Sequence, residues 1–95
     1  MPEIRFQIEW PDATQDTCYS PSLVVKQYFE AQTEYPLTDF VARSRAALQE
    51  GSDRVKAKFG RPCGLALGQL QHIEEKSVQY TNEPDARVKV VGFLE

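Results

Sequence analysis

Residues 3–10 alternate between polar and apolar side chains. The apolar members of this run are Ile4, Phe6, Ile8 and Trp10. A period of two residues is typical of a strand with one buried face. Residues 11–14 (Pro-Asp-Ala-Thr) have turn composition, so residues 15–20 are predicted to return as the second strand of a β-hairpin.

A long helix is predicted between Thr38 and Gly60. At 100° per residue, its apolar and small side chains fall in one stripe, made up of Phe40, Val41, Ser44, Leu48, Gly51, Val55 and Phe59. Thr38 is a good N-cap and Gly60 a good residue for the end of the helix. Gly51 lies inside the stripe, so we expect a point of close packing there. A second amphipathic helix is predicted from Pro62 to about Tyr80.

Residues 21–36 carry two competing patterns. Ser22 has the hydroxyl needed to cap a short helix that runs to Phe29, whereas the pair Val24-Val25 equally suits an extended chain. Residues 30–36 are expected to form a loop.

Residues 87–94 alternate again, with Val88 and Val90 on one side, and predict a last strand. The resulting order, β-β-(short α)-α-α-β, predicts an α+β fold with a single domain over residues 1–95. The N-terminal hairpin and the C-terminal strand would form a small, mostly antiparallel sheet. Two amphipathic helices would cover one face of that sheet and bury the apolar stripes together.

Composition narrows the functional classes. Of the 95 residues, 41% are hydrophobic and 26% are charged, as in ordinary soluble globular proteins. The net charge of −3 argues against nucleic-acid binding, which usually requires a strongly basic face. No apolar run approaches the roughly 18 residues that cross a bilayer, and the N-terminus lacks the apolar core of a signal peptide. We therefore expect a cytoplasmic protein without membrane contact.

The two cysteines, Cys18 and Cys63, are too few for a disulfide framework and lack metal-ligand spacing, so no metal or cofactor is predicted. Cys63 lies beside Arg61 at a predicted helix N-terminus, where a thiolate is stabilised. Its apolar position equally suits the core, which is the favoured interpretation. Cys18 alternates with Tyr19, so one of these two side chains faces the core. His72 lies on the polar face of its helix, and we expect it to be solvated without a catalytic dyad.

The segment 17–26 concentrates large functional groups around a Ser-Pro-Ser turn, where Gly, Asn or Asp would be usual. With two arginines of the long helix it forms the predicted binding surface: Cys18, Tyr19, Ser20, Ser22, Lys26, Arg43 and Arg45. Basic residues that border an apolar stripe also commonly cover the edge of the core while their charges stay in water, and this alternative remains open.

The back of the long helix is poor in charge. Ala42, Ala46 and Ala57 lie there, with Asp53 as the only interruption. Alanine suits a helix by propensity alone. Small side chains also permit the close approach of another chain, so homo-oligomerisation or partner docking through this face is the alternative prediction.

Four runs of the sequence resemble a small bacterial family of nitrogen-starvation-response proteins. They are residues 10–12 (WPD), 18–26 (CYSPSLVVK), 35–45 (YPLTDFVARSR) and 54–60 (RVKAKFG) with Cys63 after it. Members of this family are encoded in gene clusters with a nitrilase and several other enzymes, and they usually have glycine where this chain has Ala13. The resemblance implies a cytoplasmic protein that works with a nitrogen-scavenging or specialised metabolic pathway. It supplies no catalytic residues.

These observations favour an accessory or regulatory protein that is not itself an enzyme and binds an enzyme or a metabolite of that pathway. The alternative is a small thiol-dependent enzyme or carrier that uses Cys18 or Cys63.

Overall fold

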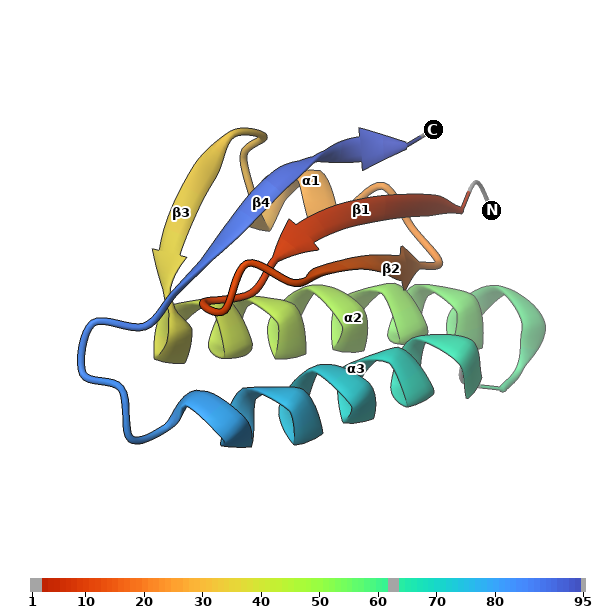
Figure 1. Ribbon diagram of the computed structural model, residues 1–95. Helices are drawn as coiled ribbons and strands as arrows, with labels where there is room; N and C mark the ends of the chain where they lie inside the picture. The colour runs from red at the N-terminus through yellow and green to blue at the C-terminus, as the bar shows by residue number, and fades with distance from the viewer. Residues whose placement is uncertain (1–2, 62–63, 95) are drawn as a thin grey trace.

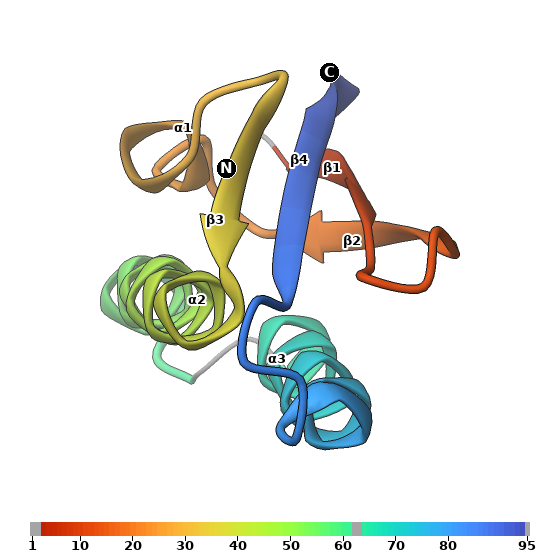
Figure 2. The same cartoon turned by 60° about the vertical axis from the view of Figure 1, so that its left-hand side comes forward.

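The computed structural model describes residues 3–61 and 64–94. Its elements are β1 (Ile4–Glu9), β2 (Gln15–Ser20), α1 (Val25–Tyr28), β3 (Thr33–Pro36), α2 (Leu37–Phe59), α3 (Gly64–Ser77), the 3₁₀ turn η1 (Val78–Tyr80) and β4 (Arg87–Leu94). The strands form one antiparallel sheet in the order β2-β1-β4-β3, and α2 and α3 lie on the same side of it (Figures 1 and 2). The predicted α+β class, with a hairpin, a C-terminal strand and two covering helices, is confirmed.

The predicted hairpin between β1 and β2 is confirmed, and its register places Phe6 opposite Cys18. Its turn is closed by the N–H of Trp10, which donates to the carbonyl of Thr14 at 2.8 Å. The carboxylate of Asp12 accepts the N–H and the hydroxyl of Thr14, at 3.1 and 2.6 Å. Ala13 has φ of 71°, a left-handed conformation that favours glycine because it crowds a Cβ against the backbone.

The prediction of a loop over residues 30–36 is wrong for its second half. Thr33–Pro36 form the edge strand β3, in which Tyr35 pairs with Val88 of β4 and is buried. A strand of four residues is too short to show a period, and Pro36 read as a loop signal. Proline is nevertheless tolerated in an edge strand, because its missing N–H faces no neighbouring strand there.

The predicted N-cap of the long helix is also wrong. Helix α2 begins at Leu37, directly after Pro36, and no side chain caps it. The N–H of Leu37 instead donates to the carbonyl of Ala86 at 3.0 Å, so the segment before β4 satisfies one of the open helix donors. The predicted end is confirmed, since Gly60 has φ of 85° and its N–H bonds to the carbonyl of Lys56.

An aromatic cluster fills the space between the sheet and the helices. The ring of Phe29 lies 5.9 Å from that of Phe6, 5.4 Å from Phe40 and 5.3 Å from Tyr35. Four residues of the predicted apolar stripe of α2 are buried, and one of them, Phe40, belongs to this cluster. Phe59 is an exception at 59% exposure, because the C-terminal end of α2 extends past the sheet (Figure 1).

Among the described residues, no helix combines the length and the apolar composition that a membrane span requires.

Candidate functional site

The Ser-Pro-Ser turn is part of the packed interior. Ser20 and Ser22 are buried, and the hydroxyl of Ser20 donates to the carbonyl of Ser22 at 2.8 Å. The hydroxyl of Ser22 accepts the N–H of Val24 at 3.2 Å, so it stabilises the turn before α1 and does not cap that helix. Pro21 lies so close to α2 that a Cβ at Gly51 would be 3.1 Å from its Cγ. These hydroxyls therefore serve the turn, and the predicted close packing at Gly51 is confirmed.

Cys18 is the member of the Cys18–Tyr19 pair that faces the core. Its side chain is fully buried, and burial raises the pKa of its thiol far above the ordinary value, with a smaller contribution from Asp16. These surroundings disfavour the thiolate that a nucleophile requires. Tyr19 points to the opposite face of the sheet, where the guanidinium of Arg5 lies 5.8 Å from its ring centroid. Cys63 lies outside the described residues.

Arg43 is held by three structural elements. Its Nε donates to the carboxylate of Asp39 on α2 at 2.9 Å, and its Nη1 donates to the carbonyl of Tyr28 at the end of α1 at 2.8 Å. The guanidinium also lies 5.0 Å from the ring centroid of Tyr35 on β3. The hydrogen bond to Asp39 raises the pKa of Arg43 further. The side chain therefore has one defined orientation, although 42% of it is exposed.

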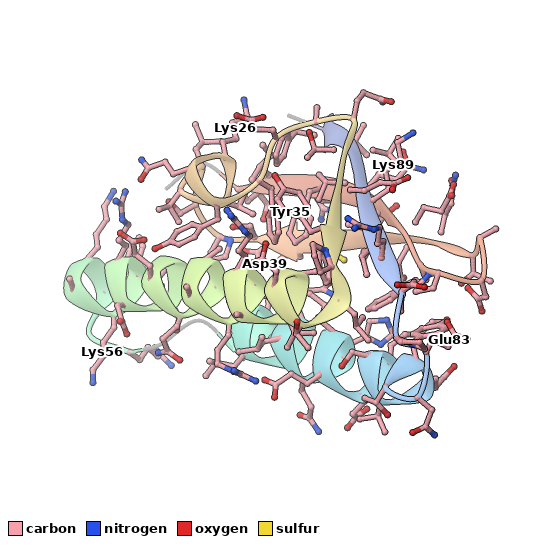
Figure 3. All side chains as sticks on the ribbon, turned by 90° about the vertical axis from the view of Figure 1, so that its left-hand side faces the viewer. Lys26, Tyr35, Asp39, Lys56, Glu83 and Lys89 are labelled. Atoms are coloured by element: carbon pink, nitrogen blue, oxygen red, sulfur yellow. The ribbon has the colours of Figure 1, made fainter. Side chains whose placement is uncertain are left out.

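A cavity of about 340 Å³ opens beside Arg43. Its walls come from α1, the segment after it, β3 and α2, and consist of Lys26, Gln27, Tyr28, Phe29, Glu30, Thr33, Tyr35 and Arg43. We call this hollow the α1 cavity. In Figure 3, Lys26, Tyr35 and Asp39 all lie on the side of the molecule where these elements meet. The structure thus brings together two of the predicted binding residues, Lys26 and Arg43.

Arg45 is separated from this site. It lies on the opposite flank of α2, where its Nη2 is 3.4 Å from the carboxylate of Glu74 on α3. Residues two positions apart on an α-helix point about 200° apart. Arg43 and Arg45 are close in sequence but therefore belong to different surfaces.

A contact that the sequence did not indicate joins His72 to Asp16. The Nε2 of His72 lies 2.8 Å from Oδ2 of Asp16, which also accepts the indole N–H of the buried Trp10 at 3.1 Å. His72 lies on the exposed polar face, as predicted, but it is not merely solvated. The pair links α3 to β2, as does Gln69, whose side-chain oxygen accepts the N–H of Tyr19 at 3.0 Å. His72 and Asp16 are 56 residues apart, so no local pattern reveals the contact.

Within residues 3–61 and 64–94, no group of three or more histidine, cysteine, aspartate or glutamate side chains is placed to hold a metal ion.

Comparison with known proteins gives one relevant finding for the chain. Residues 5–93 match the model of a family described as nitrogen starvation-induced protein NitG. No curated protein and no solved structure matches the chain.

Proposed function

This chain belongs to the NitG family of nitrogen starvation-induced proteins, and on that premise we propose that it is an accessory or regulatory protein, not an enzyme. It would act in a nitrilase-linked pathway by binding a partner enzyme or metabolite at the α1 cavity. The family match supports the link to nitrogen starvation. The nitrilase link rests on the sequence resemblance, and the binding role rests on the geometry of the cavity.

The orientation of Arg43 carries the proposal. A guanidinium has five N–H donors, and the contacts to Asp39 and Tyr28 use two of them. The remaining donors have no hydrogen-bond partner among the described residues. Because the side chain is already fixed, a ligand would not have to order it on binding. A planar guanidinium suits a carboxylate in particular, since two parallel N–H···O bonds can form.

The other charged residues of the cavity refine the expected ligand. Lys26 also lines the cavity, with its Nζ 5.8 Å from the ring centroid of Phe93 on β4, and Glu30 contributes a negative charge. A ligand that places a carboxylate near Arg43 and an ammonium group near Glu30 would match all three. The cavity volume lies within the range of small-molecule sites, ~300–1,000 Å³. The shared chemistry is therefore a carboxylate with a nearby cation, on a metabolite or on an exposed segment of an enzyme.

The thiol-dependent alternative gains no support from the described residues. The burial and raised pKa of Cys18 oppose it. For Cys63 it stays a prediction from the sequence.

The test is co-purification of the full-length tagged chain from nitrogen-starved cells. Bound proteins and small molecules would be identified by mass spectrometry for the parent, for Lys26→Glu and for Arg43→Lys. Lys58→Glu is the matched control, because it makes the same charge change at an exposed position outside the cavity. We expect the parent and the control to recover the same partner, and the two cavity variants to recover at least tenfold less.

Equal recovery by all four proteins would refute the cavity as the binding site. Since Arg43 also ties α1 to α2, the thermal unfolding of each variant must be compared with that of the parent. A second arm would add amino acids and dicarboxylates to the pure protein. A rise in melting temperature that is lost in Lys26→Glu identifies a metabolite as the ligand, whereas a protein recovered without such a rise identifies a protein partner.

A further inference from the structure

The side of α2 and α3 that faces away from the sheet is covered by no other element of the described chain (Figures 1 and 2). We call it the outer helical face. Two large apolar side chains are exposed on the half of this face formed by α3 and η1, Leu67 at 39% and Val78 at 65%. A hollow of about 370 Å³ lies between them.

The α2 half of the same face is recessed, whereas the other half protrudes. Its side chains Ala42 and Ala46 are small and exposed. Beside Ala42, a second hollow of about 250 Å³ is walled mainly by apolar groups, including those of Leu37 and Val41. Ser77 and Thr81 also line this hollow, and they flank Val78 along the chain, so the hollow lies at the level of Val78 along the helices.

We propose that the outer helical face is the interface of a symmetric dimer of this chain. A twofold axis that lies in the interface and runs parallel to the helices places α3 of each copy on α2 of the other. Such an axis preserves the level along the helices, so Val78 of each copy enters the hollow beside Ala42 of the other. A twofold interface must be self-complementary, and a face with one protruding and one recessed half meets that requirement.

Charge complementarity also supports a second copy of this chain as the partner. Arg45 lies between the two halves and already pairs with Glu74 of its own chain at 3.4 Å. Glu75, the next residue, is exposed and belongs to the wall of the larger hollow. In the dimer, α3 of the second copy lies over Arg45, so the guanidinium meets Glu75 of that copy as well. A cation surrounded by carboxylates from both chains favours this register over a random contact.

The available area is sufficient. The molecule is 40 Å long, and this dimension runs along the two helices (Figure 1). By rise per residue α2 is ~35 Å long and α3 with η1 is ~27 Å long, so with each helix ~10 Å across the face offers on the order of 600 Å². This is the lower end of what each partner of a standard interface contributes, ~600–1,000 Å². The face lies on the other flank of α2 from Arg43, so dimerisation leaves the α1 cavity open. The inference is therefore independent of the proposed function.

The test is sedimentation equilibrium of the full-length chain between about 1 and 500 μM. We expect the parent to sediment as a dimer in the upper part of this range. Val78→Glu would bury a charge in an apolar hollow, and we expect it to weaken the dimer about 100-fold. Leu94→Glu is the matched control, because Leu94 is 54% exposed and lies at the end of β4 opposite Arg5. It should dimerise like the parent.

A charge exchange tests the register. Arg45→Glu alone should weaken the dimer, and Arg45→Glu combined with Glu75→Arg should restore at least part of the lost affinity. A parent that stays monomeric at 500 μM, or a dimer unaffected by Val78→Glu, would overturn the proposal. So would a monomeric parent that captures a different protein in a Val78-dependent manner. Circular dichroism of each variant shows whether its fold is intact, which we expect because the substituted side chains are exposed.

Discussion

Alanine at Gly51 should destabilise the protein, although this exchange usually stabilises a helix. Alanine is favoured over glycine inside a helix by ~0.5–1 kcal/mol. At Gly51 the new Cβ would lie 3.1 Å from Cγ and 3.4 Å from Cδ of Pro21. Carbon atoms normally pack at ~3.5–4.0 Å, and the proline ring cannot rotate away. Overpacking of this kind costs ~1–3 kcal/mol, so we expect a net loss of about 1 kcal/mol.

Gly68→Ala is the matched control, because a Cβ at that position on α3 meets no atom within 4 Å. It should gain ~0.5–1 kcal/mol from helix propensity alone. Urea unfolding followed by circular dichroism, in dilute protein, measures both variants. For a chain of this size, 1 kcal/mol corresponds to a change in melting temperature of ~4–8 °C. The two variants should therefore move in opposite directions.

Pro21→Ala completes a double-mutant cycle with Gly51→Ala. If the proline ring is the obstacle, the cost of Gly51→Ala should fall in the Pro21→Ala background, with a coupling of ~0.5–3 kcal/mol. Equal stabilisation by Gly51→Ala and Gly68→Ala, or a coupling near zero, would show that the turn does not pack on α2 as described.

Four further predictions concern single residues. Ala13→Gly should stabilise the hairpin by ~0.5–1 kcal/mol in urea unfolding, because it relieves a left-handed backbone. Phe29→Ala should cost ~3–5 kcal/mol in the same assay, since it empties the centre of the aromatic cluster. In a Cys63→Ser background, Cys18 should resist alkylation at neutral pH until urea unfolds the chain; rapid native labelling would contradict its burial. Hydrogen bonds from the side chain and the N–H of Thr14 lower the pKa of Asp12. The ionised carboxylate therefore stabilises the folded state at pH values above its ordinary pKa, and this stabilisation is lost as the pH falls through the lowered pKa of the folded state. Asp12→Asn should therefore be less stable than the parent at pH 7 and equal to it at strongly acidic pH.

The parts of the fold that the sequence predicted are those with a long, regular period. Ile4, Phe6 and Ile8 alternate along β1 and Trp10 continues the pattern, while α2 repeats its apolar stripe over several turns, so a local pattern was enough. The strand β3 was not predicted, because four residues are too few to show a period and Pro36 suggested a loop. The start of α2 was predicted at the wrong residue, because the N–H of Leu37 is satisfied by the carbonyl of Ala86. This is a tertiary contact, and no capping residue in the sequence indicates it.

The candidate site was predictable only in part for a related reason. Lys26 and Arg43 were singled out by type, and their meeting at one cavity depends on the packing of α1 against α2. The contact between His72 on α3 and Asp16 on β2 depends on where α3 packs, so helix periodicity placed His72 on the polar face without identifying its partner. Ser20 and Ser22 were read as accessible groups because composition does not distinguish an exposed hydroxyl from one that closes a turn.

The Ser-Pro-Ser turn nevertheless bears on the site, because it sets the position of α1. The turn is fixed by its own hydroxyl bonds and by the contact of Pro21 with Gly51, and α1 follows it directly. The last residue of α1, Tyr28, then contacts α2 twice: its hydroxyl donates to Glu50 at 2.8 Å and its carbonyl accepts from Arg43. A shift of the turn must move Tyr28 and hence the acceptor that orients Arg43. If the α1 cavity binds a carboxylate, Gly51→Ala should therefore weaken binding more than its effect on stability explains, and Pro21→Ala should restore both.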